Sequence, residues 1–134
     1  ATNDRAVNHE VALWCNENQI LVNVVDSLQD SSFIVNAAVR RGDLLLTVST
    51  GGISPALSRQ IRLQLEEQFG PEYGQLLEIL AKTRQEAMTA ISDSAKRREF
   101  LQNLAELPLL EVLQQEGTEE AKKRVKLCLS SYSG

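Results

Sequence analysis

The sequence predicts an α/β remnant followed by an all-α region. A helical pattern at the N-terminus leads into an apolar run at 20–25. Two further apolar runs, the second of which alternates, flank a glycine-containing turn at 40–43. Every segment after the second run has helical spacing. We therefore expect, in order, the last helix–strand unit of an open α/β domain, a β-hairpin with its helix, and a small helical domain.

The helix–strand unit begins with a helix expected over 4–18, for which Asn3 or Asp4 is the N-cap. The run at 20–25 is apolar in all but one position, which is typical of a strand buried on both faces of a parallel sheet. An acid just after such a strand lies where open α/β sheets bind ligands, and Asp26 has that position. The alternative is an ordinary aspartate that ends a strand and starts a turn.

The β-hairpin is expected to use strands at 33–39 and 44–50 around the turn. A two-stranded hairpin is marginal by itself, so we expect it to pair with the sheet of a partner subunit in a homodimer. A glycine pair and a helix at 54–69 follow, and backbone N–H groups at such a turn favour anions. The candidate anion-binding residues are Ser49, Thr50, Gly51, Gly52 and Ser54. The alternative is a tight turn with a standard cap.

The helical domain is expected to contain helices at 72–91 and 95–106, a short helix after Pro108, and a last helix capped by Thr118. The second of these helices begins with Lys96, Arg97 and Arg98, at the helix end where the dipole disfavours cations. These cations are therefore candidate partners for ligand carboxylates. The alternative is a solvated charged face.

The composition excludes several classes of function. The 134 residues are 43% apolar and 24% charged, with a net charge of −4, which does not favour binding to nucleic acid or to an anionic membrane. No apolar run approaches the ~18 residues that span a bilayer, and the polar start lacks the apolar segment of a signal peptide. Cys15 and Cys128 lie far apart and no spacing predicts a metal site. We expect a cytoplasmic protein with two reduced core thiols.

An ordered set of short strings runs along the chain. They are A-T-N-D-x-x-V-N at 1–8, N-V-V-D at 23–26, S-F-I at 32–34, R-R-G-D-L at 40–44, S-T-G-G-x-S-P-A-L at 49–57 and A-K-R-R-x-F at 95–100. In this order and at this compact spacing, the set resembles the siroheme-synthesis enzymes, which are precorrin-2 dehydrogenases and often also sirohydrochlorin ferrochelatases. The resemblance covers residues 1 to about 100.

The resemblance implies a division into three parts. Residues 1–26 would be the end of an NAD-binding Rossmann domain, 27–70 a dimerisation region with the hairpin at 33–50 and the helix at 54–69, and 71–134 a helical domain that covers the substrate. The sequence has no G-x-G-x-x-G turn after an early strand. We therefore expect this chain to be the C-terminal two thirds of such an enzyme and not to complete the NAD step by itself.

The resemblance also implies roles for individual residues. Asp26 would be the catalytic general base, both for oxidation of precorrin-2 and for insertion of Fe²⁺ if the chain is also a chelatase. The tetrapyrrole carboxylates would bind at the candidate anion-binding turn and at Arg97 and Arg98, and Thr2 and Asn3 would lie next to the NAD. The competing hypotheses are a non-catalytic helical dimerisation or tetrapyrrole-binding module, and an unrelated NAD-dependent oxidoreductase.

Four other polar residues have simpler expected roles. His9, the single histidine, is expected on the surface or in local packing. Asn8 and Asn23 are expected to hold loop backbone, and Asp30 to be a solvated loop residue.

Overall fold

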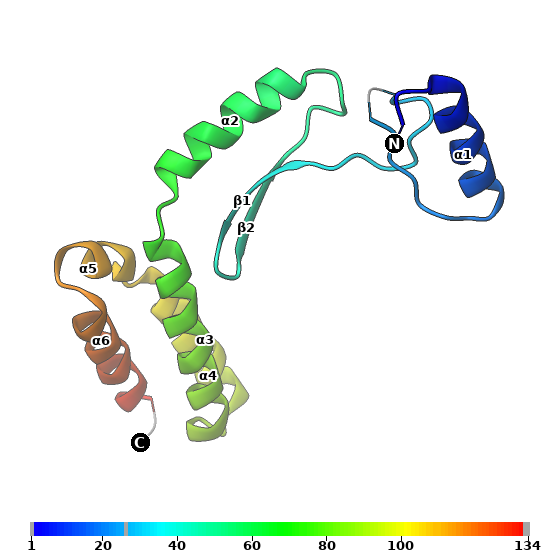
Figure 1. Ribbon diagram of the computed structural model, residues 1–134. Helices are drawn as coiled ribbons and strands as arrows, with labels where there is room; N and C mark the ends of the chain where they lie inside the picture. The colour runs from blue at the N-terminus through cyan, green and yellow to red at the C-terminus, as the bar shows by residue number, and fades with distance from the viewer. Residues whose placement is uncertain (1, 26, 133–134) are drawn as a thin grey trace. The chain divides into compact units, whose positions relative to one another are not determined.

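The computed structural model describes residues 2–25 and 27–132, which form two compact units (Figure 1). The first unit contains the chain up to residue 38 together with 47–64, and the second unit contains 39–46 together with the chain from 65 onward. The elements are α1 (Arg5–Glu17), β1 (Ala37–Arg41), β2 (Leu44–Val48), α2 (Pro55–Gln68), α3 (Glu72–Ala90), α4 (Ser94–Glu106), α5 (Leu109–Gln115) and α6 (Thr118–Ser130). None of the helices in the described ranges has the length and apolar character that crossing a membrane requires.

Aspartate side chains bind the first free amides of α1 and α4. Asp4 accepts hydrogen bonds from the backbone N–H groups of Ala6 at 2.9 Å and Val7 at 3.3 Å, which confirms it as the N-cap of α1. Asp93 caps α4 in the same way. The predicted cap at Thr118 is wrong: Gly117 is the N-cap of α6, Thr118 is its first residue, and no side chain caps this helix.

The strand predicted at 20–25 is not formed. Val22 and Ser32 bind each other instead, with the Val22 N–H donating to Ser32 Oγ at 2.8 Å and the Ser32 N–H donating to Val22 O at 2.8 Å. A strand needs a neighbouring strand to complete its ladder of hydrogen bonds. Among the described residues the sheet consists of β1 and β2 alone. The backbone at 20–25 therefore has no neighbouring strand there, and serine side chains take part in its hydrogen bonds instead.

The predicted hairpin is confirmed, although its strands are shorter than expected. They pair over Ala37–Arg41 and Leu44–Val48, so the connecting turn is Gly42-Asp43. Gly42, the first residue of this turn, has φ +59°. Two-residue hairpin turns need a positive φ at that position, and glycine adopts it without strain.

The hairpin tip contacts the start of α3 through backbone alone, within the second unit. A Cβ atom on Gly74 would lie 3.2 Å from the carbonyl carbon and oxygen of Arg41, and one on Gly42 would lie 3.4 Å from the Cα of Gly74. The Arg41 guanidinium donates to the carbonyl oxygens of Phe69 at 2.8 Å and Glu66 at 3.1 Å, at the C-terminal end of α2. These carbonyls are ones that a helix leaves unpaired at its end.

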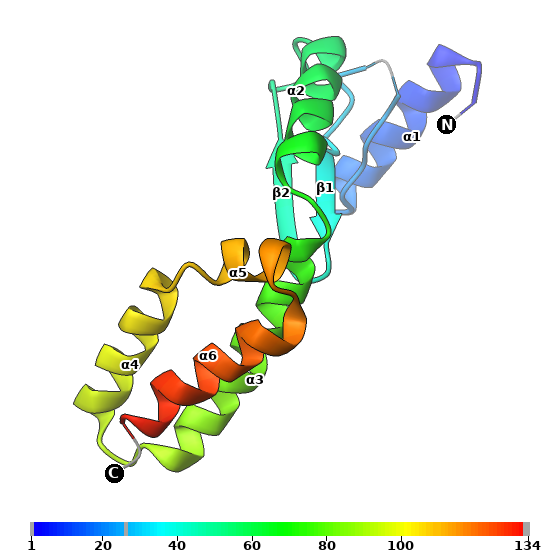
Figure 2. The same cartoon turned by 90° about the vertical axis from the view of Figure 1, so that its left-hand side faces the viewer.

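The hydrophobic core of the second unit lies between its helices. α3 packs against α4, α5 and α6, as Figure 2 shows. Phe100 is fully buried and meets the Tyr132 ring edge-on, with 5.6 Å between ring centroids. The buried cluster consists of Ile79, Ala87, Ile91, Phe100, Leu104, Leu109, Val112, Leu113, Ala121 and Val125.

Candidate functional site

Two segments singled out by the sequence line one pocket of the first unit, with a volume of about 640 Å³. Val25 and Ser27 come from the loop that follows α1, and Gly52 and Pro55 come from the turn before α2. Asp26, the predicted catalytic residue, lies outside the described residues, so its assignment stays a prediction. Both of its sequence neighbours line the pocket.

The turn at 49–54 is held by its own hydroxyl groups. The Ser54 N–H donates to Thr50 Oγ1 at 3.2 Å, and Thr50 Oγ1 lies 3.0 Å from Ser58 Oγ, which is buried. The Gly51 N–H donates to Ser49 Oγ at 3.2 Å. Ser54 Oγ accepts from the Leu57 N–H at 3.3 Å, which confirms Ser54 as the cap of α2. The turn is therefore held by contacts within the chain, and its role in binding stays a prediction.

Gly52 is the point where the turn meets the loop after Asp26. Its φ is +78°, and a Cβ atom there would lie 2.2 Å from Leu28 Cδ2. Only a residue without a side chain leaves room for Leu28. The two predicted motifs are thus joined by direct packing, a relation that the sequence does not reveal.

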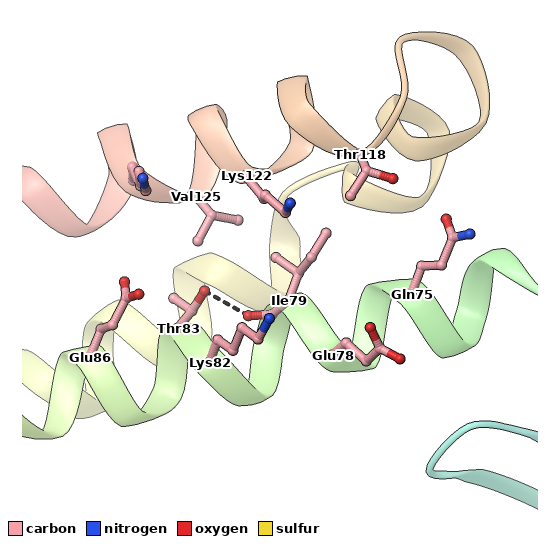
Figure 3. Close-up of a pocket in the computed structure, with 10 residues that line it drawn as sticks. Gln75, Glu78, Ile79, Lys82, Thr83, Glu86, Thr118, Lys122 and Val125 are labelled. Carbon is pink, nitrogen blue, oxygen red and sulfur yellow. Dashed lines mark hydrogen bonds between the residues drawn. The ribbon is translucent and has the colours of Figure 1, made fainter.

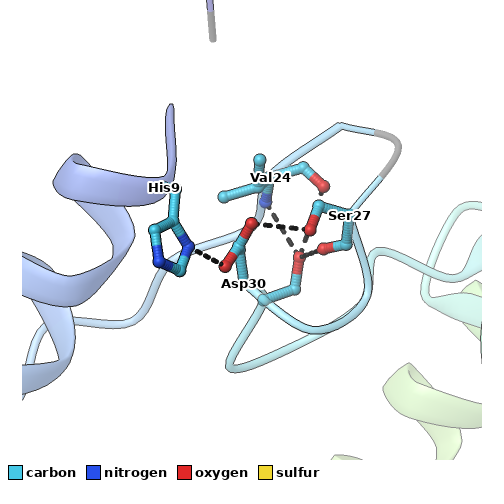
Figure 4. A network of polar contacts seen from close by, with 5 residues as sticks. His9, Val24, Ser27 and Asp30 are labelled. Atoms are coloured by element: carbon cyan, nitrogen blue, oxygen red, sulfur yellow. Dashed lines mark hydrogen bonds and ion pairs between the residues drawn. The ribbon is translucent and has the colours of Figure 1, made fainter. Parts of the chain in front are cut away.

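The loop at 23–33 is fixed by side chains that bind backbone (Figure 4). Ser31 Oγ accepts from the Val24 N–H at 2.9 Å and donates to Ser27 O at 2.7 Å. The Ser27 N–H donates to Val24 O at 3.2 Å, and Asn23 Nδ2 donates to Phe33 O at 2.9 Å. The expectation that Asn23 holds loop backbone is confirmed. The backbone on each side of residue 26 is therefore tied to the rest of the loop.

Asp30 is not the solvated loop residue that the sequence predicts. Its Oδ2 accepts a hydrogen bond from Ser27 Oγ at 2.7 Å, and its Oδ1 lies 2.6 Å from His9 Nδ1 on α1. The Ser27 hydroxyl and then His9 hold the pKa of the Asp30 carboxyl below its ordinary value. His9 is exposed, as expected, but it is also the link between α1 and this loop.

Arg97 and Arg98 lie near the start of α4 in the second unit. The Arg97 guanidinium donates to Ile91 O at 2.8 Å, at the C-terminal end of α3. A cation at that end is favourable for the dipole of α3, which gives a structural reason for basic residues at this place. Arg98 is exposed. A role for either residue in binding substrate stays a prediction.

Thr2, one of the two residues assigned to NAD, is bound locally at the start of α1. Thr2 Oγ1 donates to Asp4 O at 3.1 Å, the Thr2 N–H donates to Asn8 Oδ1 at 2.9 Å, and Asn8 Nδ2 donates to Thr2 O at 2.8 Å. Asn8 thus holds backbone, as predicted. Leu28 fills the space beside the glycine pair. Roles for Thr2 and Asn3 with NAD stay predictions, and no reaction step is derived through the cofactor.

A second cavity, of about 500 Å³, lies between α3 and α6 in the second unit (Figure 3). Lys82 on α3 and Lys122 on α6 line it together with Glu78, and Thr83 forms part of its floor, where Thr83 Oγ1 donates to Ile79 O at 2.8 Å. None of the predicted catalytic, substrate-binding or cofactor-binding residues lines this cavity. Acids and a base alternate along α3, at Glu78, Lys82 and Glu86, whereas α6 contributes two lysines to the lining.

Comparison with protein families matches the chain in three consecutive pieces. Residues 1–37 match a model described as putative NAD(P)-binding, 41–68 match one described as sirohaem biosynthesis protein central, and 72–128 match one described as sirohaem synthase dimerisation region. Piece by piece, the chain is thus similar to proteins of siroheme synthesis. The predicted fold class, an α/β remnant with a hairpin and a helical domain, is confirmed by this order of matches and by the elements described above.

Individual members of the siroheme synthase family match over nearly the whole chain. The siroheme synthase of Methylococcus capsulatus is 38% identical over 92% of this chain and 26% of its own length. The precorrin-2 dehydrogenase of Methanosarcina barkeri is 31% identical over 98% of this chain and 58% of its own length. The solved structure of SirC, a precorrin-2 dehydrogenase, matches 95% of this chain and 61% of its own chain, with 28% identity and a TM-score of 0.75.

One family match differs from the predicted three-part division in where it places the dimerisation region. The family model described as a dimerisation region covers the helical part of the chain, whereas the sequence analysis assigned dimerisation to 27–70. The two boundaries of that division therefore stay a prediction. The chain spans about a quarter to three fifths of the length of these relatives.

Proposed function

We propose that the chain is part of an enzyme that oxidises precorrin-2 to sirohydrochlorin with NAD, in siroheme biosynthesis. The observation that carries this proposal is the precorrin-2 dehydrogenase of M. barkeri, which is 31% identical over 98% of this chain. The match to a putative NAD(P)-binding model at 1–37 supports a nicotinamide cofactor. The pocket shared by the loop after α1 and the turn before α2 gives the reaction a candidate location.

Asp26 is the proposed general base. Dehydrogenation removes a hydride and a proton from the substrate, and the proposal concerns the proton, which a carboxylate at the pocket can accept. Its neighbours Val25 and Ser27 line the pocket, and so does Gly52 of the proposed substrate-binding turn. The carboxylates of the tetrapyrrole are proposed to meet that turn, at the N-terminal end of α2, where the helix dipole favours anions.

The test uses the intact protein with precorrin-2 and NAD, followed by the absorbance of NADH. Replacing Asp26→Asn removes the base but keeps the size of the side chain, and we expect the rate to fall at least about a hundredfold. Asp43→Asn, at the hairpin turn, is the matched control and should keep the wild-type rate. A wild-type rate for Asp26→Asn would show that another group accepts the proton. No NADH from the wild-type protein would favour a non-catalytic tetrapyrrole-binding module.

Insertion of Fe²⁺ into sirohydrochlorin is proposed as a second activity of the same site. Metal insertion displaces two pyrrole protons. The base that accepts a proton in the first reaction can accept these two in turn and pass each one to water. Here Fe²⁺ is a substrate. Incubation of sirohydrochlorin with Fe²⁺ or Co²⁺ in the absence of NAD separates the two steps, and metal insertion that is as slow as in the protein-free control would restrict the enzyme to oxidation.

Homodimer formation is proposed on the match at 72–128 to a dimerisation region. Light scattering of the intact protein measures the mass directly, and a monomer at micromolar concentration would contradict the proposal. We also propose that residues 1–134 alone bind NAD weakly, because the sequence contains no glycine-rich phosphate-binding turn after a strand. Calorimetric titration of NAD into this chain tests that expectation, and tight binding would overturn it.

A further inference from the structure

A chain of hydrogen bonds connects α1 to the residue that follows Asp26. His9 Nδ1 lies 2.6 Å from Asp30 Oδ1, and Asp30 Oδ2 accepts from Ser27 Oγ at 2.7 Å (Figure 4). His9 and Asp30 are separated by 21 positions in the sequence, so this pair ties the loop to an element outside itself. Neither His9 nor Asp30 has a role in the reaction proposed above.

The geometry of the pair is that of a strong contact. His9 Nδ1 lies 2.6 Å from Asp30 Oδ1, which is short for a hydrogen bond between a nitrogen and an oxygen. The Asp30 side chain is 21% exposed, so water reaches it only in part. Its pKa, which Ser27 and His9 lower, keeps Asp30 ionised at neutral pH. Asp30 therefore accepts from both partners at once.

The backbone of Ser27 is bound within the loop, and its side chain is bound by Asp30. Ser31 binds the backbone of Val24 and the carbonyl of Ser27, and the Ser27 N–H binds Val24 O. The Ser27 side chain is bound by Asp30, and Asp30 is bound in turn by His9. Rotation of the backbone at Ser27 would break the contact with Asp30, so His9 and Asp30 together restrict the residue next to Asp26.

We propose that His9 and Asp30 are positioning residues for Asp26, which act by fixing Ser27 on the C-terminal side of the catalytic residue. This inference rests on the proposed function of Asp26.

Single and double variants of the intact protein test this role in the NADH assay. We expect His9→Ala and Asp30→Asn each to lower kcat about tenfold or more, because a small misplacement of a reacting group is costly, with little change in KM for precorrin-2. The double variant should be no slower than the slower single variant, since both act through one contact. His9→Gln keeps a hydrogen-bond donor and should recover part of the rate. Glu10→Ala, exposed on the same helix, is the matched control and should be unaffected.

The outcomes separate this inference from the proposed function. If Asp26→Asn is inactive while His9→Ala and Asp30→Asn keep the wild-type kcat, the positioning role is wrong and the proposed base stands. A change in KM alone, or additive losses in the double variant, would also overturn it. If Asp26→Asn itself keeps the wild-type rate, the proposed base is wrong. Thermal unfolding of each variant shows whether a loss of kcat comes with a loss of fold, and a kcat that falls only in proportion to unfolded protein would contradict positioning.

Discussion

The two units of the chain are stabilised in different ways. In the first unit, large apolar side chains are exposed, including Leu21 at 74% and Ile53 at 87%, and the loop is ordered by hydroxyl and amide side chains that bind backbone. In the second unit, Phe100 and Ala87 are fully buried in a cluster formed by four helices. Polar contacts thus order the unit that contains the candidate site, and apolar packing orders the other.

This difference has a physical consequence for mutations. A hydrogen bond contributes about 0.5–1.5 kcal/mol net, whereas the loss of a large buried side chain costs several times more. Substitutions in the second unit should therefore change the global stability most. Substitutions in the first unit should change local order around the site with a smaller global effect.

The largest effect is expected at the centre of the helical core. Phe100→Ala removes a fully buried ring and should lower the free energy of unfolding of the 134-residue chain by about 3–5 kcal/mol. Urea unfolding followed by far-UV circular dichroism measures the loss. Trp14→Ala, at a residue that is 57% exposed in the first unit, is the control and should cost much less. Equal losses of unfolding free energy for Phe100→Ala and Trp14→Ala would mean that apolar packing contributes equally to the stability of the two units.

The backbone contact at the hairpin tip should be the next most sensitive. Gly74→Ala places a methyl group 3.2 Å from the backbone of Arg41, where neither side can yield easily, and should cost about 1–3 kcal/mol. Gly70→Ala is the matched control, because its Cβ would meet only the movable carboxylate of Glu72. Thermal melts of both variants give the comparison, and a Gly74→Ala protein as stable as wild type would mean that the tip is free to shift.

A smaller and local effect is expected in the first unit. Ser31→Ala removes the hydroxyl that binds Val24 and Ser27, and should cost about 1 kcal/mol. Hydrogen exchange should become faster at the Val24 amide and stay unchanged in α3. Ser130→Ala, whose hydroxyl binds one carbonyl at the end of α6, serves as the control. Faster exchange throughout the second unit would contradict the separation of the two units.

Acid should weaken α4 through its cap. The N–H groups of Ala95 and Lys96 hold the pKa of the Asp93 carboxyl below its ordinary value of 3.8. A lowered pKa means that this stabilisation is present above the ordinary value and is lost as the pH falls through the lower folded-state value. Asp93→Asn keeps a capping oxygen that does not titrate, so its helical signal should fall less steeply below about pH 4. Parallel acid titrations of the two proteins measure this, and identical curves would assign the acid sensitivity to other groups.

Local signals in the sequence predicted the helices well, and non-local contacts account for most of what it missed. Asp4 and Asp93 are caps that can be read from a few neighbouring residues, and α1, α2, α3 and α4 begin within a residue or two of the expected positions. The strand at 20–25 was wrong because a strand depends on a neighbour that the local pattern does not show.

The candidate site was predicted in part. The sequence singled out Gly52 and the loop that follows α1, and the structure brings them to one pocket. It did not predict the packing of Leu28 on Gly52 or the pairing of Asp30 with His9, since both join residues that are far apart in the chain. A lone histidine and a loop aspartate have no spacing signal that would identify such a pair.

The division of the chain has a consequence for how it can be cut. The boundaries between the two units fall at 38/39, 46/47 and 64/65, which lie inside β1, β2 and α2. At each boundary the chain therefore goes from one unit to the other within a hydrogen-bonded strand or helix. A truncated protein that begins at residue 65 would lack the hairpin tip. The space beside Gly74 would then be empty, and the Phe69 carbonyl would lose its hydrogen bond from Arg41. Neither unit is a single continuous segment, so neither can be transplanted into another protein without redesigning its connections.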